Sequence, residues 1–198
     1  MGFESGKRKG NIWNDVLFID SLIKQKGAST DKKSNSGIMN ISGKDERTFE
    51  TRFSSLLEAN TDRLNGKIIT QQNNDTSVQA VYCFGKKHRP DMSVNEDGIA
   101  IEIKYINNSL DGLKMALGQS LMYRLRYKFV INLIVVSEEN KEIYEKAIND
   151  EEKDLEDIMK YLADSLNIFT YIVPGFSLKN NQKRVFEVNG LEIPQQQK

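Results

Sequence analysis

The sequence is nearly devoid of cysteine and histidine: its 198 residues include only Cys83 and His88. An internal disulfide, a zinc site of cysteine and histidine ligands, and a four-cysteine iron–sulfur cluster are therefore excluded. The chain also lacks a glycine-rich phosphate loop and a Ser/His/Asp arrangement, so nucleotide-dependent and esterase chemistries rank low. A metal ion, if the protein binds one, must be held by oxygen ligands.

A long hydrophobic run and a net charge are absent as well. The longest largely apolar run, Phe129 to Val136, contains Asn132 and is far too short to cross a bilayer. No signal peptide is recognised at the start, so we expect a cytoplasmic protein with no membrane partner. The 28 basic residues balance the 28 acidic residues, so binding of nucleic acid would require an uneven distribution of charge over the surface.

The length of the chain predicts one domain, and its first 44 residues are predicted to hold a helix and a loop that precede the α/β part of the chain. The helix is expected from Ile12 to Ile23, capped by Asn11 or Asn14, and a Lys/Ser/Gly-rich loop follows from Lys26 to Lys44. Basic residues outnumber acidic ones in this part of the chain. Two interpretations remain open for it, a nucleic-acid-binding arm and a solubilising tail.

Residues 45–198 are predicted to form one domain of the α/β class. The expected elements are a helix at Asp45–Ala59, β-like runs at Lys67–Thr70, Val78–Phe84 and Gly98–Tyr105, a helix at Asp111–Tyr127, a buried strand at Phe129–Val136, an acidic helical segment at 138–165, and strands at Ile168–Val173 and Val185–Val188. A strand, a helix and a second buried strand in succession suggest a βαβ crossover. The acidic segment is interpreted as a solvated outer face.

The run Gly98–Tyr105 carries two charged residues inside a β-strand pattern. Side chains alternate between the two faces of a strand, so Glu102 and Lys104 lie on the same face. Asp91 precedes Glu102 by eleven residues and would meet it across a hairpin. Phosphodiester hydrolysis needs a divalent cation on oxygen ligands and a positive group near the reacting oxygens. Two carboxylates and a lysine supply these groups.

Pro90-Asp91 followed by Glu102-x-Lys104 resembles the signature of the PD-(D/E)xK nuclease superfamily, which includes restriction endonucleases, Holliday-junction resolvases and RecB-type nucleases. A second element, Gln119 followed by Tyr123 on the next predicted helix, is similar to the QxxxY element of RecB-like members. Members of the superfamily often carry a glutamate on the first core helix as well. Glu46 is the first candidate for that position here and Glu50 the second.

The resemblance implies a restriction-endonuclease-like fold, with a mixed central β-sheet flanked by α-helices. It implies that Asp91, Glu102 and the main-chain carbonyl of Ile103 bind Mg²⁺ or Mn²⁺, assisted by Glu46 or Glu50. Lys104 would orient the attacking water, and Gln119 would position Lys104 or the substrate. The nucleic-acid contacts expected around this site are Lys86, Lys87, His88, Arg89, Tyr123 and Arg126.

The activity implied is hydrolysis of DNA by a metal-dependent endonuclease that leaves a 5′-phosphate, and a homodimer is expected because a duplex has two strands to cut. Three alternatives remain open. The same site could hydrolyse RNA, a silent nuclease fold could serve for binding, or the motif could be accidental in an α/β interaction protein. Glu102 and Lys104 would then be surface charges of an edge strand, and Asp91 a turn residue.

Overall fold

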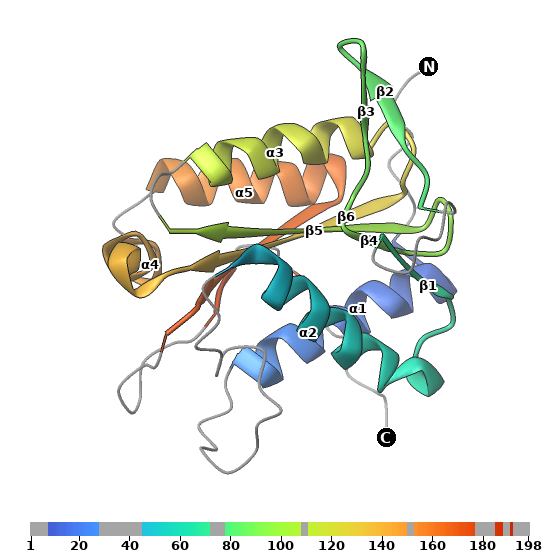
Figure 1. The fold of residues 1–198 in the computed structure, drawn as a ribbon, viewed down its shortest axis with the longest axis horizontal. Helices are drawn as coiled ribbons and strands as arrows, with labels where there is room; N and C mark the ends of the chain where they lie inside the picture. Colours follow the sequence, from blue (N-terminus) through green and yellow to red (C-terminus); the bar gives the residue numbers. More distant parts are fainter. Residues whose placement is uncertain are drawn as a thin grey trace.

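A six-stranded mixed sheet lies at the centre of the protein, with the strand order β1-β4-β5-β6-β7-β8 (Figure 1). The computed structural model describes residues 8–27, 45–71, 78–107, 111–149, 153–176, 185–187 and 191. The strands are β1 (Ile68–Thr70), β2 (Val81–Cys83), β3 (Lys86–His88), β4 (Met92–Val94), β5 (Ile99–Ile106), β6 (Phe129–Val136), β7 (Ile168–Pro174) and β8 (Phe186–Glu187). The α-helices are α1 (Asn11–Gly27), α2 (Glu46–Glu58), α3 (Asp111–Tyr123), α4 (Lys141–Ile148) and α5 (Lys153–Leu166).

Parallel strands form the middle of the sheet, and antiparallel strands form its edges. Strand β6 runs parallel to both β5 and β7, whereas β1, β4 and β8 pair in the antiparallel sense. Helix α3 connects β5 to its parallel neighbour β6, which confirms the predicted βαβ crossover. The α/β class and the mixed central sheet are confirmed as well.

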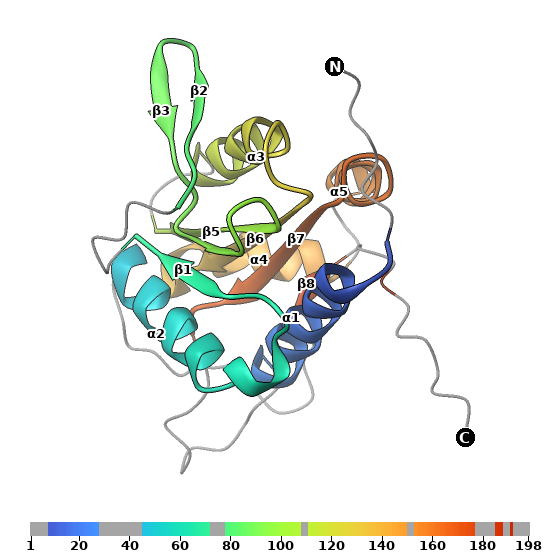
Figure 2. The same cartoon turned by 90° about the vertical axis from the view of Figure 1, so that its right-hand side faces the viewer.

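Helices cover both faces of the sheet (Figures 1 and 2). Helices α1 and α2 lie on one face, and α3 and α5 lie on the other. Strand β5 contributes to both cores: Ile101 and Ile103 pack on the α1/α2 side, while Ala100 packs with Tyr123 of α3. The predicted alternation of β5 is therefore confirmed, but both of its faces are buried.

Helix α1 belongs to the same core as the rest of the protein. Val16, Ile19 and Ile23 are fully buried and pack in one cluster with residues of β5, β6 and β7. The helix of this segment is therefore part of the central core, and its role as a nucleic-acid arm stays a prediction. Asn11 and Asn14 lie within the helix, so neither caps it; residues 28–44, and with them most of the predicted loop, lie outside the described residues.

Two short strands, β3 and β4, are absent from the sequence prediction, since β3 consists of three polar residues and β4 lies between turn-forming residues. Strand β3 turns the predicted loop before Asp91 into a hairpin with β2. The acidic segment contains two helices, α4 and α5, and its residues Asp154, Asp157 and Asp164 are exposed as predicted. Within the described residues, no helix combines the length and the apolar character needed to cross a membrane.

Candidate active site

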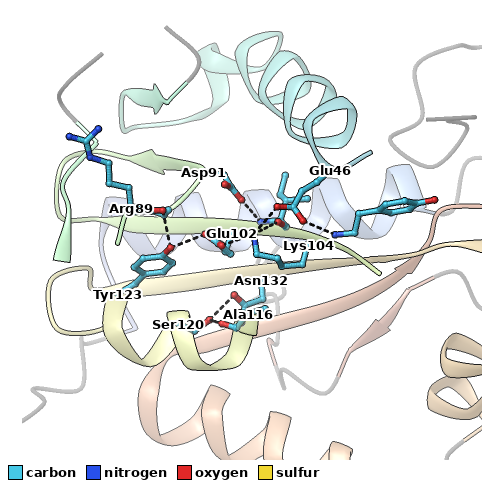
Figure 3. Close-up of polar contacts among 12 residues, drawn as sticks. Glu46, Arg89, Asp91, Glu102, Lys104, Ala116, Ser120, Tyr123 and Asn132 are labelled. Carbon is cyan, nitrogen blue, oxygen red and sulfur yellow. Dashed lines mark hydrogen bonds and ion pairs between the residues drawn. The ribbon is translucent and has the colours of Figure 1, made fainter. Parts of the chain in front are cut away.

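The candidate site lies where β5 extends beyond its neighbour β4. Strand β4 pairs with β5 only from Ile99 to Ile101, and Asp91 immediately precedes β4. The next main-chain N–H groups on this edge donate to carboxylates: Ile103 N–H donates to Asp91 Oδ2 (2.7 Å), and Tyr105 N–H donates to Glu46 Oε2 (3.1 Å). Two carboxylates thus accept the main-chain hydrogen bonds of β5 beyond the point where its pairing with β4 ends (Figure 3).

The ammonium group of Lys104 lies at the centre of this cluster. Its Nζ atom is 2.8 Å from Glu46 Oε1, 2.9 Å from Glu102 Oε1 and 3.2 Å from the main-chain oxygen of Ile103. The ion pair between Glu102 and Lys104 confirms that they share a face of β5. The ammonium group of Lys104 therefore joins the first residue of α2 to β5, although the two lie more than 50 positions apart in the sequence.

Tyr123 of α3 supports Glu102 from the protein interior. Its hydroxyl group lies 3.0 Å from Glu102 Oε2 and 2.9 Å from the main-chain oxygen of Arg89. Because a phenol has one hydrogen, the hydroxyl group shares it between these two acceptors. The side chain of Tyr123 is fully buried, so the predicted contact with nucleic acid does not fit its position.

The two carboxyl groups of the site resist ionisation together. Burial, followed by repulsion from Glu102, raises the pKa of Asp91 from 3.8 to about 8. Burial also raises the pKa of Glu102, although Lys104 and the hydroxyl group of Tyr123 act in the opposite direction. The site therefore lacks enough positive charge to keep both carboxylates ionised at neutral pH, and an additional cation would correct this deficit.

Lys104 and Tyr123 keep their protons. Burial acts to lower the pKa of Lys104, but attraction to Glu102 and Asp91 outweighs it, so the pKa is raised. Burial, reinforced by the nearby Glu102, raises the pKa of Tyr123. A permanently charged ammonium group and a neutral phenol thus flank Glu102, and neither can act as a general base.

A buried polar network holds α3 against the sheet. Ser120 Oγ lies 2.7 Å from Asn132 Oδ1 and 2.6 Å from the carbonyl of Ala116, and the Asn132 amide donates to Thr170 Oγ1 at 3.3 Å (Figure 3). These side chains are almost completely buried. Asn132 was the sequence signal for this network, since it is the one polar residue in the apolar run of β6. The network fixes the helix from which Tyr123 reaches Glu102.

Two other predicted residues, Glu50 and Gln119, lie on the helices next to the cluster. Glu50, one turn after Glu46 on α2, is partly buried and adds to the repulsion that raises the pKa of Asp91. The Oε1 atom of Gln119 is buried and has no hydrogen-bond partner among the described residues. The predicted contact between Gln119 and Lys104 is therefore not formed here, and a role toward substrate stays a prediction.

The predicted basic residues lie on one hairpin and at the end of α3. Lys86, Lys87 and His88 form β3, and Arg89 follows directly. Arg126 is exposed in the turn after α3. Lys87, Arg89 and Arg126 line one cavity, whereas Lys86 and His88 do not, and the sequence pattern placed the first four residues in a loop.

The oxygen atoms of the cluster fit a hard divalent cation. Among the described residues, no group of three or more His, Cys, Asp or Glu side chains is arranged to hold a metal ion. The candidate donors here are two carboxylates, of Asp91 and Glu102, and one main-chain oxygen, of Ile103. The positively charged ammonium group of Lys104 contacts Glu102 and the Ile103 oxygen. Oxygen donors of this chemistry suit Mg²⁺ or Mn²⁺, which keep several water ligands. The donor atoms are thus of the type that this class of ion prefers, and binding of an ion here stays a prediction.

Comparison of the chain with protein-family models, with curated proteins and with solved structures finds no match. The geometry of the site and its chemistry therefore carry the functional argument.

Proposed function

We propose that this protein is a metal-dependent nuclease of the PD-(D/E)xK type, which hydrolyses phosphodiester bonds in DNA. One observation carries the proposal: Asp91, Glu102 and Lys104 converge at the uncovered edge of β5, with the carbonyl of Ile103 between them. Burying two carboxyl groups and a lysine at a strand edge lowers the stability of the fold. Such costly charged clusters are typical of functional sites. The restriction-endonuclease-like fold is part of this proposal.

In this proposal Asp91, Glu102 and the Ile103 carbonyl hold Mg²⁺ or Mn²⁺, with Glu46 or Glu50 assisting. When bound, the ion would lower the pKa of the attacking water and neutralise charge on the phosphate. Lys104 keeps its proton at the pH of the reaction, so it acts by orienting the water and by stabilising negative charge as it develops.

Tyr123 acts as a positioning residue in this scheme. Its neutral hydroxyl group contacts Glu102 from the buried side, which leaves the opposite oxygen, Oε1, directed toward Lys104. Glu46 has a similar role on the other side, because its two oxygens hold Lys104 and the Tyr105 N–H at once. The site is thus pre-organised by contacts on both sides of the strand edge.

DNA is preferred over RNA as the substrate, and endonucleolytic over exonucleolytic cleavage, on the resemblance of the motif to DNA nucleases. The homodimer expected from that resemblance also stays a prediction. Sedimentation velocity of the purified protein, alone and with duplex DNA, would measure it. The alternative reading of a silent nuclease fold predicts nucleic-acid binding without cleavage.

The test is cleavage of supercoiled plasmid, single-stranded DNA and single-stranded RNA in Mg²⁺, in Mn²⁺ and in EDTA, with wild-type protein and Asp91→Asn. The proposal predicts that wild type cuts DNA only with a metal ion, and that Asp91→Asn is inactive on the same substrate. Cutting of RNA alone would change the substrate class. Cutting in EDTA, or equal cutting by both proteins, would contradict the proposal.

A further inference from the structure

The β2–β3 hairpin projects from the body of the protein beside the end of α3 (Figures 1 and 2). Tyr82 and Phe84 lie at its outer part with 75% and 89% of their surfaces exposed. The turn places Phe84 at φ 51° and Gly85 at φ 69°, which is the left-handed conformation of a tight hairpin turn. A phenylalanine in this conformation is unfavourable for the backbone and gains nothing from burial here. Two aromatic rings are thus offered to a ligand.

Positive charge accompanies these rings. Lys86 and Lys87 are exposed on β3, and the ammonium group of Lys87 lies 5.9 Å from the centre of the Tyr82 ring. A cavity of about 320 Å³ at the base of the hairpin has among its lining residues Gln79, Tyr82, Lys87, Arg89, Glu96 and Arg126. Three of these side chains are basic and one is acidic, and the acidic Glu96 already accepts a hydrogen bond from Gln79. The cavity therefore suits an anionic ligand that also carries flat rings.

The hairpin leads directly into the candidate active site. After β3 the chain passes through Arg89 and Pro90 to Asp91. The carbonyl of Arg89 accepts a hydrogen bond from Tyr123, whereas its side chain extends away from Asp91 and Glu102 (Figure 3). The Nε atom of Arg89 is buried and has no hydrogen-bond partner in the part of the chain that the structure describes. Arg89 thus connects the two places, because its side chain lines the cavity and its carbonyl shares the Tyr123 hydroxyl group with Glu102.

We infer that the β2–β3 hairpin and the cavity at its base bind an unpaired stretch of nucleic acid and direct it to Asp91 and Glu102. Tyr82 and Phe84 stack on exposed bases, and Lys87, Arg89 and Arg126 contact the phosphates. Unpaired nucleotides are favoured over duplex because only unpaired bases present their flat faces to a protein ring. The inference rests on the proposed function for its choice of nucleic acid, and it specifies which form of substrate the site accepts.

The test is binding of fluorescent oligonucleotides to the full chain in EDTA, where cleavage is absent. The probes are single-stranded DNA, single-stranded RNA and a blunt DNA duplex of the same sequence. The double variant Tyr82→Ala/Phe84→Ala is compared with Tyr161→Ala, which removes a tyrosine of similar exposure, 64%, from α5. Lys87→Ala is compared with Lys160→Ala, an exposed lysine on α5.

Wild type is expected to bind a single strand more tightly than the duplex, and the double variant is expected to lose about tenfold or more in affinity. Lys87→Ala should weaken binding and lower its dependence on salt, and both α5 controls should bind as wild type does. Stacking has a direct readout as well: the fluorescence of Tyr82→Trp should be quenched by a single strand, and that of Tyr161→Trp should not.

Equal affinity of the double variant and its control would overturn the inference, and so would a Tyr82→Trp signal that the single strand does not change. Absence of any nucleic-acid binding by wild type would also overturn it and would leave the exposed rings to a protein partner. Binding in EDTA without cleavage in metal would support the hairpin and contradict the nuclease. Cleavage with unchanged binding of the double variant would do the reverse.

Discussion

At the scale of single residues, the carboxyl group of Asp91 makes the stability of the folded protein depend on pH. Its pKa is about 8 in the folded protein and 3.8 in an unfolded chain, so the folded state holds the proton more tightly. The resulting stabilisation is fully present below about pH 4 and is lost as the pH rises through 8. The metal-free protein should therefore become less stable toward alkaline pH.

Asp91→Asn removes this titration while keeping an oxygen that can accept from Ile103 N–H. Urea unfolding of metal-free protein from pH 4 to pH 9 should show that wild type loses stability relative to Asp91→Asn as the pH rises. Parallel stability curves for the two proteins would show that burial and repulsion do not raise the pKa of Asp91 as described.

Tyr123→Phe removes the hydroxyl group that contacts Glu102 and keeps the buried ring. The pKa of Glu102 should rise, because this contact lowers it in the wild type. We expect about a tenfold loss of cleavage at pH 7, the scale of one hydrogen bond to a charged group, and a shift of the acidic limb of the pH–rate profile to higher pH. The exposed Tyr161→Phe serves as control. An unchanged profile would mean that Tyr123 only fills space.

At the scale of elements, the connection from β4 to β5 sets the register of Asp91 against Glu102. A Cβ atom added at Gly98 would lie 2.4 Å from the main-chain oxygen of Val94 and 3.0 Å from Ile12 Cδ1. Gly98→Ala should therefore destabilise the protein by about 1–3 kcal/mol, as overpacking does, and lower activity through the displaced strands.

The matched control is Gly118→Ala, at a glycine inside α3 where an added Cβ would meet nothing within 4 Å. This change should stabilise the protein by about 0.5–1 kcal/mol, because alanine restricts the unfolded helix segment more than glycine does. Thermal unfolding of the two variants measures both effects. An unchanged stability of Gly98→Ala would contradict the close packing described for the connection from β4 to β5.

The elements that could be predicted from the sequence are those with a long periodic pattern. Strand β5 shows it by the alternation of Ile99, Ile101 and Ile103, and β6 by its apolar run. The pairing of Glu102 with Lys104 follows from the same alternation. Strand β3 could not be predicted because its residues, Lys86, Lys87 and His88, are polar and typical of a loop, and β4 could not because its three residues lie between the turn-forming Asp91 and Asn95.

Side-chain positions that depend on distant parts of the chain could not be predicted either. Periodicity placed Tyr123 on the flank of α3 near the site, but only the packing of α3 on the sheet shows that its hydroxyl group lies beneath Glu102. Likewise, the buried Asp20 of α1 accepts a hydrogen bond from Tyr171, 151 residues later. No local pattern links such pairs, and that is why α1 was assigned to a separate arm.

At the scale of the whole molecule, the proposed metal ion would couple binding to stability. The cluster joins α2, the start of β4, β5 and α3, so an ion that relieves the repulsion between Asp91 and Glu102 stabilises all of these elements together. At a concentration of Mn²⁺ about a hundred times its Kd, the gain is about 2.7 kcal/mol. Thermal unfolding with increasing Mn²⁺ should show a rising Tm for wild type and little change for Glu102→Gln. Equal shifts in both proteins would place the ion elsewhere.

The most direct test of the central claim is the rate at which excess protein cleaves a labelled DNA strand at pH 8 in Mg²⁺, for wild type, Glu102→Gln and the exposed control Glu142→Gln on α4. We expect Glu102→Gln to lose at least about a hundredfold in rate while it remains folded, and Glu142→Gln to cleave as wild type does. Equal rates for Glu102→Gln and wild type, or no cleavage of any strand by wild type, would contradict the claim that the edge of β5 is a nuclease active site.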